Sequence, residues 1–156
     1  MEFEFFYGYN HPLSQWYYSD FVIDGIKFNC CEQWMMYSKA ILFHDNEKAE
    51  AILKEPRANF QRKLGRQVRF FKNEIWLKER KEIVYKGNLQ KFQQNRELAS
   101  FLRMTGNKVL AEASPSDLIW GIGLSDSNPD RFYPEKWPGE NLLGEILMKV
   151  RNKLNT

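Results

Sequence analysis

A glutamate and a lysine lie seven residues apart in the segment CEQWMMYSKA, residues 31–40. On an α-helix seven residues are nearly two turns, so Glu32 and Lys39 would lie on the same side, about 10 Å apart along the axis. A carboxylate can shuttle protons, and a deprotonated lysine can act as a nucleophile. The simpler interpretation is a first-turn acid favoured by the helix dipole, followed by a solvated lysine. The spacing alone leaves both interpretations open.

A second cluster lies in ASPSDLIWGIGL, residues 113–124. It combines the carboxylate of Asp117 with Trp120 and Gly121 on one expected bend. A carboxylate, an indole and flexible glycines suit a ligand site. Ser114 could equally cap a short helix that begins at the following proline, so a purely structural role stays open.

The third cluster is WPGENLLGE, residues 137–145, where the last helix is expected to begin. Gly139 and Asn141 precede that helix. Backbone N–H groups at the N-terminus of a helix can hold phosphate. This segment is therefore a candidate phosphate site.

Positive charge is concentrated in residues 54–91, which contain twelve Lys or Arg against four Glu, a net charge of +8. The whole chain carries +3, so the remaining residues carry −5. These bases could be solvated helix faces, or they could attract a ligand that bears phosphate. A protein that binds nucleic acid through this segment is a further interpretation, and its affinity would fall steeply with salt.

Several common site types are not indicated. His11 and His44 have no paired spacing for zinc, and the adjacent Cys30 and Cys31 cannot form a framework of bridges. No glycine-rich nucleotide motif or Gly-x-Ser-x-Gly elbow is present, so no metal or cofactor is expected and catalysis would rest on carboxylates, lysine and aromatic rings. Without a long apolar run or a signal-peptide pattern, we expect no membrane partner and a cytoplasmic location.

The elements that must position these residues are mostly helices. FVIDGIKF, residues 21–28, predicts a hairpin that turns at Asp24-Gly25. KVLAEA, residues 108–113, predicts a short strand. Helices are expected over 31–43, 46–54, 57–64, 73–94 with Gly87 as a weak point, 96–106 with Gly106 as a C-terminal cap, and 141–154. The 156 residues therefore predict a single domain of the α+β class over 1–156, predominantly helical with a small sheet or hairpin.

Five segments, taken in this order, resemble the NADAR superfamily (NAD- and ADP-ribose-associated), which includes the YbiA-like N-glycosidases: GIKFNCCEQWMMYSKAILF, KLGRQV, KFQQN, LRMTGNKVLAEASPSDLIWGIGL and WPGENLLGEILMKVR. The resemblance extends from about Phe6 to Leu154. One departure is PLSQWY, residues 12–17, where the family usually reads something like Pro-Phe-Ser-Asn-Phe. Gln15 has a longer hydrogen-bonding side chain than the asparagine usual at this position. The resemblance therefore defines the type of reaction better than it defines the substrate.

The resemblance implies a YbiA-like fold and hydrolysis of the bond between ribose C1 and an exocyclic amine of a base. Two substrate classes follow from it: phosphorylated ribosylamino-pyrimidine intermediates of riboflavin synthesis, and ADP-ribose attached to guanine in a nucleotide or nucleic acid. Lys39 would form a Schiff base, Glu32 would shuttle protons and Asp117 would be a second carboxylate. The implied binding residues are Trp76 and Trp120 for the base, Gly121 in the bend, Arg66 and Asn141 for phosphate, and Gln15.

Two alternatives stay open. Glu32 or Asp117 could stabilise an oxocarbenium ion while water attacks directly, as in ordinary glycosidases. The chain could also be a non-catalytic module that binds ADP-ribose or NAD. Two carboxylates beside a lysine argue against such a module, because an anionic ligand would bind better without them.

Overall fold

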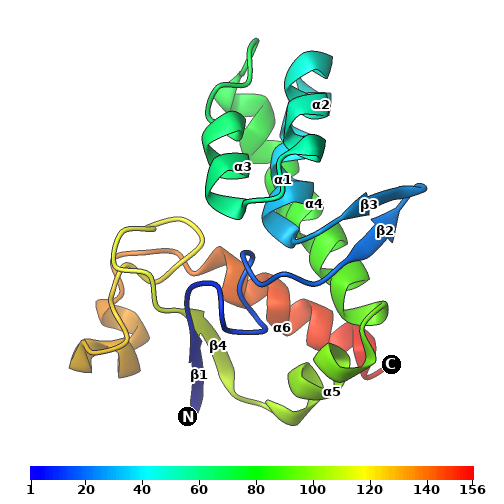
Figure 1. Cartoon of the computed structure of the whole chain (residues 1–156). Coiled ribbons are helices and arrows are strands. Elements are labelled where there is room, and N and C mark those ends of the chain that lie inside the picture. Colours follow the sequence, from blue (N-terminus) through cyan, green and yellow to red (C-terminus); the bar gives the residue numbers. More distant parts are fainter. The chain divides into compact units, whose positions relative to one another are not determined.

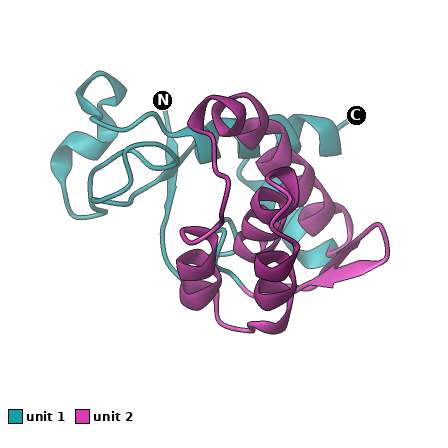
Figure 2. Ribbon diagram, turned by 90° about the horizontal axis from the view of Figure 1, so that it is seen from above, with its two compact units in different colours: residues 1–17, 96–156 teal, residues 18–95 magenta.

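The structure is a computed structural model that describes residues 1–156. The chain forms two compact units (Figure 2). Unit 1 consists of Met1–Tyr17 and Arg96–Thr156, and unit 2 consists of Tyr18–Asn95. Six α-helices and two small sheets confirm the predicted α+β class with helix predominating. The single domain expected over the whole chain stays a prediction.

Unit 2 begins with the predicted hairpin. Strand β2 (Phe21–Ile23) pairs antiparallel with β3 (Ile26–Phe28). The turn residues Asp24 and Gly25 have φ values of 51° and 80°. Positive φ at both central positions is what a type I′ turn requires, which confirms the prediction made from the Asp-Gly pair.

Four helices follow in unit 2: α1 (Cys31–Leu42), α2 (Asn46–Lys54), α3 (Ala58–Gly65) and α4 (Asn73–Gln93). Helix α1 packs against each of the other three (Figure 1). All four agree with the predicted helices to within one residue at each end. Because α1 lies centrally among them, its side chains are held on several sides.

Helix α4 continues through Gly87 without interruption, so the weak point expected there does not end the helix. The indole of Trp34 packs against this glycine, and a Cβ at residue 87 would lie 2.2 Å from Trp34 Cδ1. Trp34 Nε1 also donates a hydrogen bond to the carbonyl of Ile83 at 2.7 Å. The helix-propensity cost of glycine, about 1 kcal/mol, is offset by this close packing of α1 on α4.

Unit 1 contains a parallel pair of strands, β1 (Phe3–Phe6) and β4 (Val109–Glu112), with Phe3 opposite Val109 and Phe6 opposite Glu112 (Figure 1). Strand β4 is predicted and β1 is not. Helix α6 (Leu142–Leu154) packs on β4, and α5 (Arg96–Met104) packs on α6. No helix in the structure is long and apolar enough to cross a membrane.

Two short 3-10 helices, η1 (Pro129–Phe132) and η2 (Pro134–Lys136), complete unit 1. Residues 113–124 form bends and no helix, so the short helix considered for this segment does not form.

Candidate active site

The predicted site residues fall into two groups. Glu32, Lys39, Arg66 and Trp76 belong to unit 2. The members in unit 1 are Gln15, Asp117, Trp120, Gly121 and Asn141. Each group has a defined local geometry, and we describe the two separately.

Helix α1 carries both Glu32 and Lys39, as their spacing predicts. Glu32 lies in its first turn and is only 4% exposed, whereas Lys39 lies in its last turn and is partly exposed. The carboxylate of Glu32 acts electrostatically on the lysine, raising the pKa of Lys39 against two larger opposing effects. The two side chains therefore share one electrostatic environment.

Buried amides fix the start of α1. The side-chain oxygen of Gln33 accepts from the backbone N–H of Asn29 at 2.8 Å, and its Nε2 donates to the carbonyl of Ile52 at 3.0 Å. Gln61 Nε2 donates to Asn29 Oδ1 at 3.1 Å and to the carbonyl of Glu55 at 2.7 Å. Both glutamines are at most 4% exposed. This network ties the first turn of α1, and with it Glu32, to the segment between α2 and α3.

The amine of Lys39 lies in an aromatic niche. Its Nζ is 4.8 Å from the ring centroid of Phe71 and 5.7 Å from the Trp76 ring. Burial is the largest cause that lowers the pKa of Lys39, and the nearby Arg66 guanidinium lowers it further. A lysine with a lowered pKa has more neutral amine at physiological pH, which is the form that attacks carbon. Lys39 thus lies beside Trp76 in unit 2, and Arg66 and Glu32 act electrostatically on the same amine.

Phe71 belongs to this niche, although the sequence analysis does not single it out. It lies in residues 66–72, the connection between α3 and α4. The only sequence signal was an aromatic pair, Phe70-Phe71, in a basic segment, which looks equally like core.

A buried carboxylate anchors the same connection. Asp45 has no exposed surface and caps α2 by accepting from the Lys48 N–H at 3.1 Å. It also accepts from the Arg69 backbone N–H at 2.9 Å and from Arg69 Nη2 at 3.0 Å. These hydrogen bonds hold the pKa of Asp45 well below its usual range. Asp45 therefore joins the start of α2 to the middle of the α3–α4 connection.

In unit 1, Asp117 folds the bend that carries Trp120. Its Oδ1 accepts from the backbone N–H groups of Ile119 and Trp120, both at 2.9 Å. Its own N–H donates to Ser114 Oγ at 3.2 Å. One oxygen of Asp117 is thus used in shaping the backbone, and Ser114 caps a bend where a short helix was considered.

The glycines of unit 1 allow two backbone segments to touch. The N–H of Gly139 donates to the carbonyl of Ile122 at 2.9 Å, and the N–H of Asn141 donates to that of Gly121 at 3.0 Å. A Cβ on Gly139 would lie 2.2 Å from the Gly121 carbonyl oxygen. The second and third sequence clusters are therefore joined by their backbones.

Asn141 connects this region to β4. It is 3% exposed and has a left-handed φ of 54°. Its Nδ2 donates to the carbonyl of Leu110 at 2.9 Å, and its Oδ1 accepts from the N–H of Glu112 at 3.1 Å. The side-chain amide thus pairs with β4 much as a neighbouring strand would. The first two N–H groups of α6 donate to the carbonyls of Ile119 and Trp120, so phosphate at this terminus would have to replace those bonds.

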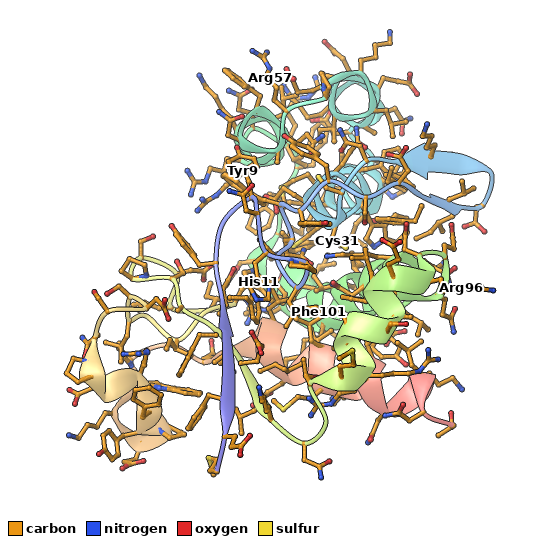
Figure 3. The ribbon with its side chains drawn as sticks, turned by 60° about the horizontal axis from the view of Figure 1, so that its bottom comes forward. Tyr9, His11, Cys31, Arg57, Arg96 and Phe101 are labelled. Atoms are coloured by element: carbon orange, nitrogen blue, oxygen red, sulfur yellow. The ribbon has the colours of Figure 1, made fainter.

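Gln15 lies in the folded loop after β1 and is 8% exposed. In this loop His11 Nδ1 accepts from the Leu13 N–H at 3.1 Å, and its ring meets Phe101 edge-on, with centroids 5.6 Å apart (Figure 3). The substrate role of Gln15 stays a prediction. No group of three or more His, Cys, Asp or Glu side chains is placed to hold a metal ion.

The NADAR domain profile matches residues 5–155. N-glycosidase R617 of Acanthamoeba polyphaga mimivirus is 42% identical over 160 residues, covering 96% of this chain and 94% of that protein. A riboflavin biosynthesis protein of Vibrio vulnificus is 31% identical over 146 residues, covering 93% of this chain but only 36% of the relative. The NMR structure of the E. coli protein YbiA matches with a TM-score of 0.79 at 22% identity, over 99% of this chain and 87% of that one, which confirms the YbiA-like fold. The chain belongs to the NADAR domain family.

Proposed function

We propose that this chain is an N-glycosidase that hydrolyses the bond between ribose C1 and an exocyclic amine of a base. The viral relative, which aligns over nearly its whole length, is named an N-glycosidase. The observation that carries the proposal is the Lys39 amine, which lies against two aromatic rings with its pKa lowered, on the helix that also carries Glu32.

The proposed reaction begins with opening of the ribose ring. The lone pair of the exocyclic nitrogen forms a C1=N bond, while the ring C1–O bond breaks and its oxygen takes a proton. The neutral amine of Lys39 then adds to C1 and loses a proton. The exocyclic nitrogen gains a proton and leaves with the C–N bonding pair, so that the base departs as its free amine. C1 remains bound to Lys39 as an imine.

Hydrolysis of that imine completes the cycle. Water adds to C1 and loses a proton. The proton of the new hydroxyl then passes to the Lys39 nitrogen as the C1–N bond breaks, which frees the lysine amine and releases the sugar as an aldehyde. Glu32 is the proposed proton carrier, donating to the ring oxygen in the first half and accepting from water in the second. A buried carboxylate on the nucleophile's own helix suits both roles.

The other residues have binding roles in the proposal. Arg66 is exposed and close enough to Lys39 to affect its charge, so a phosphate bound to Arg66 would lie near the reacting sugar. Trp76 supplies a stacking surface beside the amine. Asp117 of unit 1 uses Oδ1 for the backbone, and its role as a second carboxylate stays a proposal. We give Asn141 a supporting role, because its amide pairs with β4.

Two substrate classes fit this chemistry. The riboflavin biosynthesis relative favours a phosphorylated ribosylamino-pyrimidine. ADP-ribose on guanine, in a nucleotide or in nucleic acid, has the same exocyclic C1–N bond, and the charge of +8 over residues 54–91 would attract either ligand.

Incubating the pure protein with each class and detecting released base and sugar by mass spectrometry tests the proposal. We expect a free base and an equal amount of sugar aldehyde from at least one class. Saturable binding of ADP-ribose with no released base from either class would contradict the proposal and favour a binding module.

A further inference from the structure

The connection between α3 and α4, residues 66–72, is held by contacts of Arg69 and Phe71, the residues on either side of Phe70. Arg69 is bound through its backbone N–H and its guanidinium by the buried Asp45. Phe71 meets Phe43 edge-on, with ring centroids 5.2 Å apart, and Phe43 is buried at the end of α1. The first contact fixes the backbone before Phe70, and the second packs the Phe71 ring, which is 41% exposed, against the end of α1.

Phe70 itself adopts a strained conformation. Its φ is 63°, a left-handed value that phenylalanine rarely adopts, and its side chain is 69% exposed. The exposed ring lies 5.7 Å from the Arg69 guanidinium carbon, measured to the ring centroid. The effect of the left-handed φ is to turn the chain between Arg69 and Phe71, and strain of this kind is characteristic of sites where the position of a side chain matters.

We propose, on the basis of the proposed function of Lys39, that Phe71 is a positioning residue whose ring, together with Trp76, holds the Lys39 amine in a niche that excludes water and keeps it available as an uncharged nucleophile. The amine lies 4.8 Å from the Phe71 centroid. The Asp45–Arg69 contact and the left-handed turn at Phe70 serve to place that ring.

Two opposing effects of the Phe71 ring must be compared. Its face attracts an ammonium ion, which alone would raise the pKa of Lys39. Its bulk excludes water, which lowers that pKa. Burial is the largest cause acting on Lys39, Arg66 from the end of α3 acts in the same direction, and Glu32 from α1 opposes both. We expect the exclusion of water to outweigh the attraction of the ring face, so removing the ring should admit water and raise the pKa of Lys39 toward its ordinary value.

The test follows the 15N chemical shift of Lys39 Nζ against pH in the substrate-free protein, with the signal assigned by its loss in Lys39→Gln. We expect the titration midpoint to rise in Phe71→Ala and to rise less in Phe71→Leu. The leucine still packs against Phe43, so this second variant serves as the test if Phe71→Ala does not fold. The matched control is Phe70→Asn, which removes a ring from the same loop, suits a left-handed φ and should leave the midpoint unchanged. An unchanged or lower midpoint in both Phe71 variants overturns the inference.

The pH profile of kcat provides a second readout. Phe71→Ala should lose turnover at neutral pH and recover it at alkaline pH. A raised KM with an unshifted profile would mean that Phe71 only contacts the base, which also overturns the inference. The titration needs no substrate, so the two proposals fail separately. A raised midpoint in a protein that cleaves neither substrate class refutes the N-glycosidase proposal, whereas turnover with an unshifted midpoint refutes the role of Phe71.

Discussion

Replacing Asn141 by glycine separates its side-chain hydrogen bonds from its backbone conformation. Asn141 has φ 54° and pairs through its amide with the carbonyl of Leu110 and the N–H of Glu112. Glycine adopts this φ without strain, so Asn141→Gly removes the two hydrogen bonds and adds a smaller entropic cost from its more flexible unfolded chain. Asn141→Ala removes the same bonds and also places a residue with a Cβ in the left-handed region.

The expected cost follows from what these bonds satisfy. Leu110 is completely buried, so its carbonyl would lose a partner in a place that water does not reach. An unsatisfied buried polar group costs about 1–3 kcal/mol, so losing both bonds predicts a destabilisation of roughly 2–5 kcal/mol. Asn141→Ala should cost about 1 kcal/mol more because of its backbone.

Urea unfolding followed by circular dichroism measures both variants against the parent protein. Ligand affinity is measured alongside, at a temperature where each variant is folded. The reasoning is refuted if Asn141→Gly changes the free energy of unfolding by less than about 0.5 kcal/mol. If that variant also bound a phosphorylated ligand more than tenfold more weakly, a loss of about 1.4 kcal/mol, Asn141 would be a ligand-binding residue instead.

Three further predictions concern unit 2. Glu32→Gln should abolish turnover while ligand binding and the circular dichroism spectrum stay close to those of the parent protein, and near-normal turnover would make Glu32 only a first-turn acid. Because Arg69 lowers the pKa of Asp45, the ionised carboxylate stabilises the fold above the unfolded pKa of about 4, and this contribution is lost as pH falls through the lower folded value. Asp45→Asn should therefore have a lower free energy of unfolding at neutral pH, and that free energy should fall less steeply on acidification than in the parent protein. A constant difference in the free energy of unfolding between variant and parent at every pH would contradict this. Gly87→Ala would drive a Cβ to 2.2 Å from Trp34, so we expect a net cost of about 1–3 kcal/mol in urea unfolding despite alanine's better helix propensity, and a stabilised variant would show that the indole moves aside easily.

The sequence predicts the helices well because their ends carry local signals. Helix α2 is an example, since Asp45 caps its start and Pro56 follows its end. The Asp24-Gly25 pair likewise defines its hairpin through the two positive φ values that it permits. Such signals act within a few residues, so a single sequence contains them.

The features that escaped prediction depend on residues far apart in the chain. Strand β1 is only four residues long and is defined by its pairing with β4, about a hundred residues away. Gly87 looks like a weak point of its helix in the sequence, and only the structure shows Trp34 packed against it. Phe71 similarly gains its significance from Lys39, which lies in α1, about thirty residues earlier in the chain. In these cases tertiary contacts override the local preference.

The candidate site was predictable where one helix carried two functional groups. Glu32 and Lys39 lie on α1, so their spacing already placed them together. The structural use of Asn141 was not predictable, because a Gly-Glu-Asn approach to a helix is compatible both with phosphate binding and with an amide turned toward a strand. Only the position of β4 distinguishes the two.

Borohydride can trap the proposed imine on Lys39, because it reduces the C=N bond to a stable amine. Borohydride is added during turnover of each substrate class, and the protein is then analysed by mass spectrometry and peptide mapping. We expect a secondary amine at Lys39, within residues 31–48, whose added mass equals the reduced open-chain sugar phosphate or ADP-ribose. Lys39→Arg keeps the charge but provides no amine that can deprotonate, so it should show neither adduct nor turnover. Substantial activity in Lys39→Arg, with no adduct on the parent protein, would contradict the claim and favour direct attack by water.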